Sequence, residues 1–304
     1  MVKKVLLSIS LGAILGIQIL VAQRVVVIGL DGFSVEGYER TELPHLKQLM
    51  SEGVLSLHTR CVMPSVTLPN WTSHLTGSGP EEHGVVNNQW TLTDHSLPAL
   101  ETDDQGYYPS IFKLLKDQVT GVKTAYYYNW ANLIHPINQK YLDEVSYLED
   151  DAYLENYDKA VRFIEENAST PTFIFLYSVH TDHAGHSFEW MSPEFITALE
   201  EADEAIGKLL DQLKQKGFYE DTHFFLITDH GGLAKSHGGV SENEMLVPWG
   251  VTGPGIQSQF GGKRLDFPNS NINTAWVIAR IFNCHQIPVS WTGRVPEGIF
   301  ETQK

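Results

Sequence analysis

The sequence predicts an α/β fold in which a mostly parallel central sheet carries helices on both faces. Four apolar runs, rich in β-branched or aromatic residues, have the composition of strands that are buried on both sides; they cover residues 24–30, 123–128, 172–179 and 223–228. Helical patterns of apolar residues lie between these runs. Buried strands that alternate with amphipathic helices are typical of a parallel sheet covered on both sides.

The clearest helical pattern begins at Ser192 and Pro193, a capping residue followed by a proline in the first turn, and ends at Gly217. Its apolar residues share one helical face and include Ile196, Leu199, Ile206, Leu209, Leu210 and Leu213. Weaker patterns predict further helices over 109–118, 153–167 and 272–282, with a short helical stretch at 72–75. The polar, turn-rich segment 90–108 is expected to be a long surface loop.

The first 22 residues have the pattern of a secretory signal peptide. Lys3 and Lys4 precede an apolar run over 5–21, and the small residue Ala22 stands at the expected cleavage point. The run is short for a bilayer span, which needs about 20 residues, although an uncleaved anchor remains the alternative. We therefore expect an exported protein, periplasmic or secreted, with residues 23–304 forming one domain.

Composition and net charge exclude several classes of protein and of binding partner. Hydrophobic residues make up 42% of the chain and charged residues 19%, which is typical of a globular protein and excludes disordered and collagen-like classes. The formal net charge of −16 makes nucleic-acid polymers and anionic membranes poor partners. A negatively charged substrate would need a local positive charge, such as a metal site. In an oxidising compartment Cys61 and Cys284 could pair, but the sequence does not decide this.

Three of the four expected strands are followed by an acid, at Asp31, Asp182 and Asp229. Any one of them could merely cap a turn or a helix. Ligands of open α/β sheets, however, gather at the carboxyl ends of the strands. Histidines follow two of these acids closely, at His186, His230 and His237. Clustered Asp and His suit borderline divalent metals such as zinc, so the sequence predicts a metal site at this edge.

A possible nucleophile lies between two prolines of the segment Pro64 to Thr72. Thr67 is placed before the helical stretch at 72–75, so its hydroxyl would lie near a helix N-terminus, where backbone N–H groups favour an anion. On its own, a threonine in this position is a common helix cap. Its significance depends on the acids and histidines around it.

Taken in order, these motifs resemble the alkaline phosphatase superfamily. They are Asp31-Gly32, Thr67 with Asn70 three residues on, Asp182-x-x-Gly185-His186, and Asp229-His230-Gly231. Within the superfamily, the chain is most similar to the type I phosphodiesterase/nucleotide pyrophosphatase branch, as a compact bacterial member. The segment 64–84, with Thr-x-Pro-Asn and a later His83-Gly84, is especially similar. The resemblance runs from residue 24 to about residue 300 and implies an alkaline-phosphatase-like fold.

The resemblance implies two divalent metal ions, usually zinc. One would be held by Asp31, Thr67, Asp229 and His230, and the other by Asp182, His186 and a histidine later in the chain. His237 is our choice for that late ligand, because the compact His-Gly-Gly arrangement resembles shorter bacterial members of the superfamily. His285 and His83 are the alternatives.

The implied chemistry is hydrolysis of a phosphodiester or pyrophosphate bond in a small-molecule substrate. Thr67 would attack phosphorus and form a phosphoryl-enzyme intermediate, which water then releases. Two metals about 4 Å apart could stabilise the attacking and leaving oxygens. Asn70 and the backbone N–H of Thr67 would hold a non-bridging oxygen.

Three alternatives to hydrolysis of a diester are a phosphomonoesterase, a sulfatase and a non-catalytic metal-containing protein. A phosphomonoesterase could share the whole site, but its dianionic substrate favours extra positive charge. No Arg or Lys flanks Thr67, although Lys140, Lys235 or Arg264 could arrive from distant loops. A sulfatase would need Cys or Ser at position 67 and Arg at position 71, where this chain has Thr and Trp. A non-catalytic metal-containing protein is the remote alternative, since a binding protein needs no nucleophile among its metal ligands. Natural substrate and oligomeric state stay open.

Overall fold

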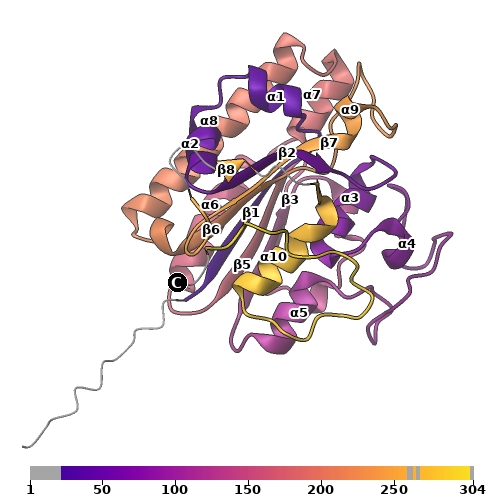
Figure 1. The fold of residues 1–304 in the computed structure, drawn as a ribbon, viewed down its shortest axis with the longest axis vertical. Coiled ribbons are helices and arrows are strands. Elements are labelled where there is room, and N and C mark those ends of the chain that lie inside the picture. The colour runs from indigo at the N-terminus through magenta and orange to yellow at the C-terminus, as the bar shows by residue number, and fades with distance from the viewer. Residues whose placement is uncertain (1–21, 259–262, 265–267, 302–304) are drawn as a thin grey trace, which may run out of the picture.

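The computed structural model describes residues 22–258, 263–264 and 268–301. The expected signal peptide therefore lies outside the described residues, apart from Ala22. Among the described helices, none combines the length and the apolar character needed to cross a membrane. Figure 1 shows one twisted sheet through the middle of the molecule, with helices on either side.

The four predicted strands are confirmed, and they are neighbours. They are β1 (Arg24–Leu30), β3 (Lys123–Tyr128), β5 (Thr172–Ser178) and β6 (Thr222–Ile227), in the spatial order β3-β5-β1-β6 and all parallel. A short strand, β4 (Glu144–Tyr147), extends this parallel half at its outer edge. Because every residue of β1, β5 and β6 is buried, these strands show the unbroken apolar runs of a covered sheet.

The other half of the sheet is mixed and was not predicted. β7 (Leu246–Thr252) runs antiparallel between β6 and β2 (Val54–Arg60), and β8 (Lys263–Arg264) and β9 (Asn269–Ser270) each pair with β2. Pro248 interrupts β7 and cannot donate to a ladder. It lies opposite a register shift between Ser56 and Thr59 of β2, where a bulge accommodates the missing N–H.

Two layers of helices cover the sheet. The predicted helices are confirmed as α5 (Ile111–Gln118), α6 (Leu154–Glu166), α8 (Pro193–Gln215) and α10 (Thr274–Ile281), and the stretch at 72–75 belongs to a longer α3 (Thr67–Thr76). Alternate residues of β1 point to opposite cores: Val25 and Val27 pack with α3, α5 and α10, whereas Val26 and Ile28 pack with α6, α8 and α2 (Pro44–Ser51). Figure 1 shows these two groups of helices on the two sides of the sheet.

Short helices complete the fold: α1 (Val35–Arg40), α4 (Pro80–His83), α7 (His180–Phe188), α9 (Glu242–Met245) and four 3₁₀ turns at Ala131–Ile134, Gln139–Tyr141, Tyr219–Asp221 and Asn271–Asn273. Cys61 and Cys284 are both buried free thiols, so the permitted disulfide is not formed. Because β1, β5 and β6 are parallel and in register, the residues that follow them meet at one edge. Asp31 N there donates to Ser178 O at 3.0 Å.

Candidate metal and nucleophile site

The predicted acids come together at the carboxyl edge of the parallel strands. Asp31 follows β1 directly, Asp229 lies two residues after β6, and Asp182 lies in the first turn of α7 after β5. All three side chains are buried. Burial of three carboxylates in one place is costly unless positive charge is also present.

The first group of possible ligands consists of Asp31, Asp229 and His230, whose ligand atoms lie within 4.8 Å of one another. His230 Nε2 is 3.0 Å from Asp229 Oδ2 and 3.7 Å from Asp31 Oδ1. His230 Nδ1 donates to Gly231 O at 2.8 Å, which fixes the ring with Nε2 toward the acids. Thr67 Oγ1 lies 3.3 Å from the same Nε2, so the hydroxyl borders this group.

The second group consists of Asp182, His186 and His237. Asp182 and His186 are one turn apart on α7, with His186 Nε2 3.5 Å from Asp182 Oδ2, and His237 Nε2 lies 3.8 Å from Asp182 Oδ1. Backbone carbonyls orient both imidazole rings. His186 Nδ1 donates to Lys235 O and His237 Nδ1 donates to Ser65 O, each at 2.9 Å. The His237 and His230 rings stack with centroids 3.6 Å apart, so the two groups adjoin.

The two other histidines considered as the late ligand lie elsewhere. His285 is exposed, and its backbone N–H donates to Gln118. His83 is buried with both ring nitrogens bonded: Nε2 to Ser73 Oγ and Nδ1 to the backbone N–H of Val85, each at 3.0 Å. Of the three candidates, His237 is the one in contact with Asp182 and His186.

The donor set fits two divalent cations. Among the described residues, Asp31 Oδ1 and Asp182 Oδ1 are buried without a hydrogen-bond partner, and Asp229 Oδ2 has only the His230 ring nitrogen beside it, at 3.0 Å. Buried polar atoms are almost always satisfied, so such orphans indicate a missing partner. Carboxylate oxygens and imidazole nitrogens with the second ring nitrogen held by a carbonyl are a donor set that zinc accepts.

The pKa shifts of Asp31 and His230 also show that the buried carboxylates require positive charge nearby. Burial raises the pKa of the Asp31 carboxyl well above its usual value, and the nearby Asp229 and Asp182 carboxylates raise it further. Burial alone would lower the pKa of His230, but the same acids outweigh it and raise that pKa to about 10. In the metal-free chain a proton on His230 partly balances the carboxylates, and cations would take over this role.

Neighbouring aromatic residues fix the Asp31 carboxylate. Its Oδ2 accepts from Trp71 Nε1 at 3.1 Å and from Tyr177 OH at 2.5 Å, which leaves Oδ1 to face His230. Gly29 of β1 allows Trp71 to approach, because a Cβ at this position would lie 2.7 Å from the indole ring. The second hydrogen-bonding layer of the site thus comes from α3 and β5.

Thr67 is the first residue of α3, and no side chain caps the helix at Val66. In this first turn the Leu68 N–H donates to Asn88 Oδ1 and Pro69 has no N–H, which leaves the N–H of Thr67 as the backbone donor for an anion. Thr67 therefore combines a hydroxyl beside His230 with one backbone donor suited to a phosphoryl oxygen.

The predicted contact of Asn70 with substrate is wrong. Its side chain is fully buried, and Nδ2 donates to the carbonyls of Val62, Pro64 and Val66 at 3.0–3.2 Å. Its Oδ1 accepts from Val62 N at 2.7 Å and from Asn271 Nδ2 at 3.1 Å. Both amide hydrogens of Asn70 are bonded to backbone carbonyls, so the side chain stabilises the loop before Thr67 and does not face a ligand.

Asn88 is the amide that sequence reasoning missed. Its Oδ1 accepts from Leu68 N at 2.8 Å, which places the side chain against the first turn of α3. No hydrogen bond to another described residue uses its Nδ2, and the residue is half-buried. A sequence signal exists only as the polar pair Asn87-Asn88, four residues after His83-Gly84. The contact with α3 is tertiary and has no local pattern.

We expect replacement of Asn88 by Asp to lower kcat by about 10²-fold or more, as loss of an oxyanion donor does. The carboxylate keeps an acceptor for Leu68 N but removes the Nδ2 donor, so the thermal midpoint should change little. Steady-state kinetics and thermal unfolding of N88D and of the exposed neighbour variant N87D make the comparison. Near-normal turnover of N88D would restrict Asn88 to a structural role.

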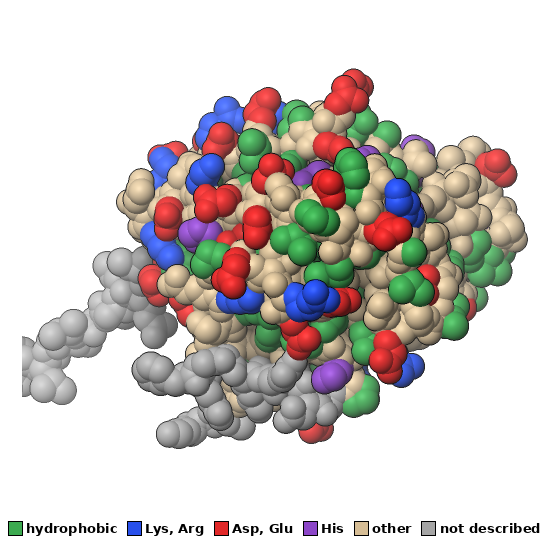
Figure 2. Space-filling model, turned by 90° about the horizontal axis from the view of Figure 1, so that it is seen from above, with side chains coloured by type: hydrophobic (Ala, Val, Ile, Leu, Met, Phe, Trp, Pro, Cys, Tyr) green, Lys and Arg blue, Asp and Glu red, His purple; other side chains and the backbone are tan. Residues whose placement is uncertain are grey.

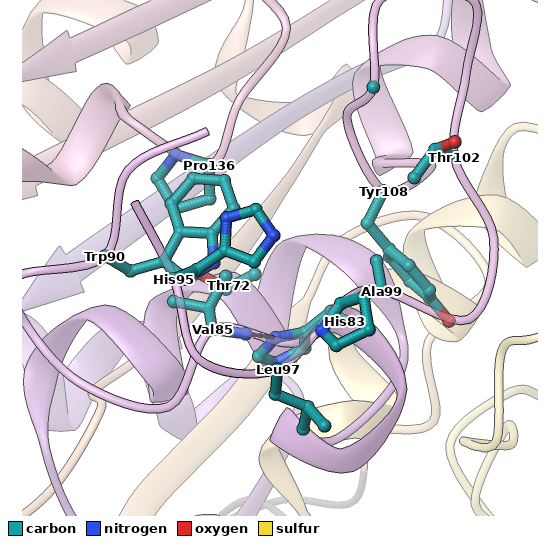
Figure 3. Close-up of a pocket in the computed structure, with 12 residues that line it drawn as sticks. Thr72, His83, Val85, Trp90, His95, Leu97, Ala99, Thr102, Tyr108 and Pro136 are labelled. Carbon is teal, nitrogen blue, oxygen red and sulfur yellow. Dashed lines mark hydrogen bonds between the residues drawn. The ribbon is translucent and has the colours of Figure 1, made fainter. Parts of the chain in front are cut away.

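The segment 90–108 is only partly the surface loop that was predicted. Trp90 and Tyr108 at its ends are buried, and between them the chain folds over a cavity of about 120 Å³. Figure 3 shows Trp90 and His95 on one side of this cavity and Tyr108 on the other, with the His95 ring stacked on Trp90 at 5.5 Å between centroids. The buried Trp90 Nε1 has no hydrogen-bond partner among the described residues.

Two of the three distant cations have other partners. Lys140 pairs with Asp104, and Lys235 Nζ donates to Ser187 O at 2.7 Å. The Arg264 side chain lies outside the part of the chain that the structure describes. Figure 2, which views the molecule from above, shows acidic side chains scattered among basic and hydrophobic ones on that face. Within the part of the chain that the structure describes, the basic partners of these carboxylates are histidines: His230 lies beside Asp31 and Asp229, and His186 and His237 lie beside Asp182.

Comparisons with known proteins identify the family of this chain. The sequence profile of the family "Type I phosphodiesterase / nucleotide pyrophosphatase" matches residues 25–248. The chain is 28% identical to mouse ectonucleotide pyrophosphatase/phosphodiesterase family member 3 over 215 residues, which cover 68% of this chain and 24% of the relative. It is also 28% identical to human bis(5'-adenosyl)-triphosphatase ENPP4 over 222 residues, 68% of this chain and 47% of the relative.

The chain thus spans between about a quarter and a half of the length of these relatives. Among solved structures, murine ectonucleotide pyrophosphatase/phosphodiesterase 5, as an inactive variant in complex with AMP, superposes with a TM-score of 0.72 at 15% identity, covering 88% of this chain and 96% of that one. This likeness confirms the alkaline-phosphatase-like fold predicted from the sequence. By its family profile, the chain belongs to the type I phosphodiesterase/nucleotide pyrophosphatase family.

Proposed function

We propose that this chain is a metal-dependent hydrolase that cleaves phosphodiester or pyrophosphate bonds through a covalent intermediate on Thr67. The observation that carries the proposal is the position of the Thr67 hydroxyl, 3.3 Å from His230 Nε2 and beside two adjoining groups of possible metal ligands. A metal site with a purely structural role has no need of a hydroxyl at a helix N-terminus beside it.

The residues divide the work as follows. Asp31, Asp229 and His230, with Thr67, would hold one divalent cation, and Asp182, His186 and His237 the other; zinc suits both sets. The bound cations would lower the pKa of the Thr67 hydroxyl and offset negative charge on the reacting phosphoryl group.

Thr67 Oγ1 attacks phosphorus in line with the leaving oxygen, forming the Thr67 Oγ1–P bond as the bond to the leaving alcohol or phosphate breaks, and the proton lost from the hydroxyl ends, by way of solvent, on the leaving group. Asn88 Nδ2 and the backbone N–H of Thr67 would donate to a non-bridging oxygen, where charge grows. Water then attacks the phosphorus and displaces Thr67 Oγ1, which regenerates the free hydroxyl.

The charges favour a diester over a monoester. Two dications and the three carboxylates Asp31, Asp182 and Asp229 leave a formal charge of about +1. This matches the single negative charge of a diester and leaves part of a monoester's charge uncompensated. In a buried site the mismatch could cost a few kcal/mol, about a hundredfold in rate.

The function is tested by comparing kcat/KM for bis-p-nitrophenyl phosphate, thymidine 5′-p-nitrophenyl phosphate and p-nitrophenyl phosphate. We expect both diesters to be the better substrates. If the monoester is better by tenfold or more, the same site belongs to a phosphomonoesterase. If no ester is turned over with zinc present, the non-catalytic alternative holds.

The comparisons support a small nucleotide-like substrate and an extracytoplasmic setting. One relative is named for bis(5'-adenosyl) triphosphate hydrolysis, and a structural neighbour is bound to AMP. The prefix "ecto" in a relative's name fits the secretory pattern of residues 1–22. We therefore propose export, periplasmic or secreted, with 23–304 as a single catalytic domain. N-terminal sequencing of the purified protein tests the cleavage.

A further inference from the structure

Trp190 contacts the backbone or side chains around both groups of metal ligands. It lies just after α7 and is buried, with Nε1 donating to Gly32 O and its backbone N–H to Ala234 O, each at 2.8 Å. Gly32 directly follows Asp31. The indole ring meets the His186 and His237 rings edge-on, at centroid distances of 5.3 and 6.2 Å.

Two glycines next to metal ligands leave room for this ring. A Cβ at Gly185, which precedes His186, would lie 2.8 Å from the indole, and one at Gly232, two residues after His230, would lie 2.1 Å from it. Both backbones thus pack directly on Trp190. Neither position has a positive φ, so close approach to the indole is the reason for glycine there.

The backbone around Trp190 is held in an uncommon conformation. Glu189 and Met191, on either side, have φ values of 90° and 68°, and Ala234, whose carbonyl accepts from Trp190, has φ 52°. Left-handed conformations of such residues cost of order 1–3 kcal/mol each and persist only where surrounding contacts determine them. Around Trp190 these contacts include its hydrogen bonds to Gly32 O and Ala234 O and its ring contacts with His186 and His237.

We propose that Trp190 is a positioning residue that fixes the spacing of the two ligand groups and thereby sets the affinity for the cations. Its Nε1 bond tethers the Asp31–Gly32 turn of the first group, and its ring edge supports His186 and His237 of the second. The inference rests on the proposed function, because it takes the two groups to hold divalent cations.

The surroundings indicate that the ring can be changed without loss of the fold. Trp190 borders a hollow of about 390 Å³ that Met191, Leu233 and Asn243 also line. Truncation would therefore enlarge an existing hollow that water can enter, rather than leave a sealed cavity in the core. Trp190→Phe keeps an aromatic ring and removes only the Nε1 donor and part of the indole.

Trp291 offers a matched control. It is also a buried tryptophan, its Nε1 donates to Pro109 O at 3.0 Å, and its ring packs on Gly77, where a Cβ would lie 2.6 Å away. None of these contacts involves a metal-ligand candidate. Trp291→Phe therefore makes the same chemical change at a comparable site elsewhere in the fold.

The test is a titration of metal-free wild type, W190F, W190A and W291F with Zn²⁺ against a chromophoric chelator, with thermal unfolding of each metal-free protein. We expect wild type and W291F to bind two ions with the same constants. W190F should bind at least one ion about tenfold or more weakly, the range seen when groups that orient metal ligands are lost. Added Zn²⁺ should restore W190F turnover.

Two results would overturn the inference. One is that W190F and W190A bind both ions with wild-type constants. The other is that W291F weakens binding as much as W190F, which would show a general effect of a destabilised fold. If wild type itself takes up fewer than two ions, the two-metal proposal fails, and the inference fails with it.

Discussion

The Thr67→Ala variant is expected to remain folded and to lose about 10³-fold or more of its turnover of a phosphodiester. The side chain contributes its hydroxyl next to His230, and no other described hydroxyl forms a hydrogen bond to His230 Nε2. Thr67 is buried, but the substitution removes only a hydroxyl and a methyl group and no helix cap, so its cost in stability should be small compared with the loss of activity. Steady-state kinetics with purified protein of known zinc content make the measurement.

Thr67→Ser is the matched control, since it keeps the nucleophilic hydroxyl and loses only a methyl group. We expect it to retain far more activity than the alanine variant. Zinc content should be similar in all three proteins, because Asp31, Asp229 and His230 remain. An alanine variant with about half of the wild-type activity would point to direct attack by water.

Removal of His237 should have the second-largest effect. His237→Ala leaves Asp182 and His186 as the described ligands of the second group, and two ligands hold zinc poorly. We expect the zinc content to fall from about two ions per chain toward one. Turnover of a diester should fall by about 10²-fold or more, because the leaving oxygen loses its stabilising charge. Metal analysis and kinetics on the same preparation test both points.

His285→Ala provides the control for this variant. His285 was an alternative for the late ligand, but it is exposed, and its backbone N–H donates to Gln118, which is not among the candidate ligands. Its loss should leave zinc content and kinetics unchanged. If His285→Ala reduced the zinc content and His237→Ala did not, the assignment of the second group would be reversed.

The parallel half of the fold could be predicted because its strands are covered on both faces. Burial of every residue in β1, β5 and β6 forces an unbroken apolar sequence that is visible without a structure. β2 and β7 gave no such signal. β2 has polar, exposed residues at His58 and Arg60 and a break in its register, and β7 contains Pro248 opposite this bulge, a compensation that only the partner strand reveals.

The candidate ligands could be predicted because they are local to strand ends. Parallel strands bring the residues after β1, β5 and β6 to one edge, so three motifs far apart in sequence meet there. The amide donor could not be predicted in this way. Asn70 is close to Thr67 in sequence but turns back to the preceding loop, whereas Asn88 reaches α3 through a tertiary contact.

The contacts of Trp190 also could not be predicted from the sequence. In the sequence it is one aromatic residue after the candidate ligands Asp182 and His186, and nothing nearby distinguishes it from a core tryptophan. Its contacts with Gly32, Gly185 and Gly232 join three segments that are separated in the chain, and such contacts have no sequence period. The glycines are visible in the sequence, but the ring that requires them is not.

The most direct test of a covalent Thr67 intermediate is the steric course at phosphorus. A phosphorothioate diester of known configuration is hydrolysed in ¹⁸O-labelled water, and the configuration of the product is determined. Attack by Thr67 and then by water gives two in-line displacements, each of which inverts phosphorus, so the account predicts overall retention. Overall inversion would mean a single displacement by water and would contradict it.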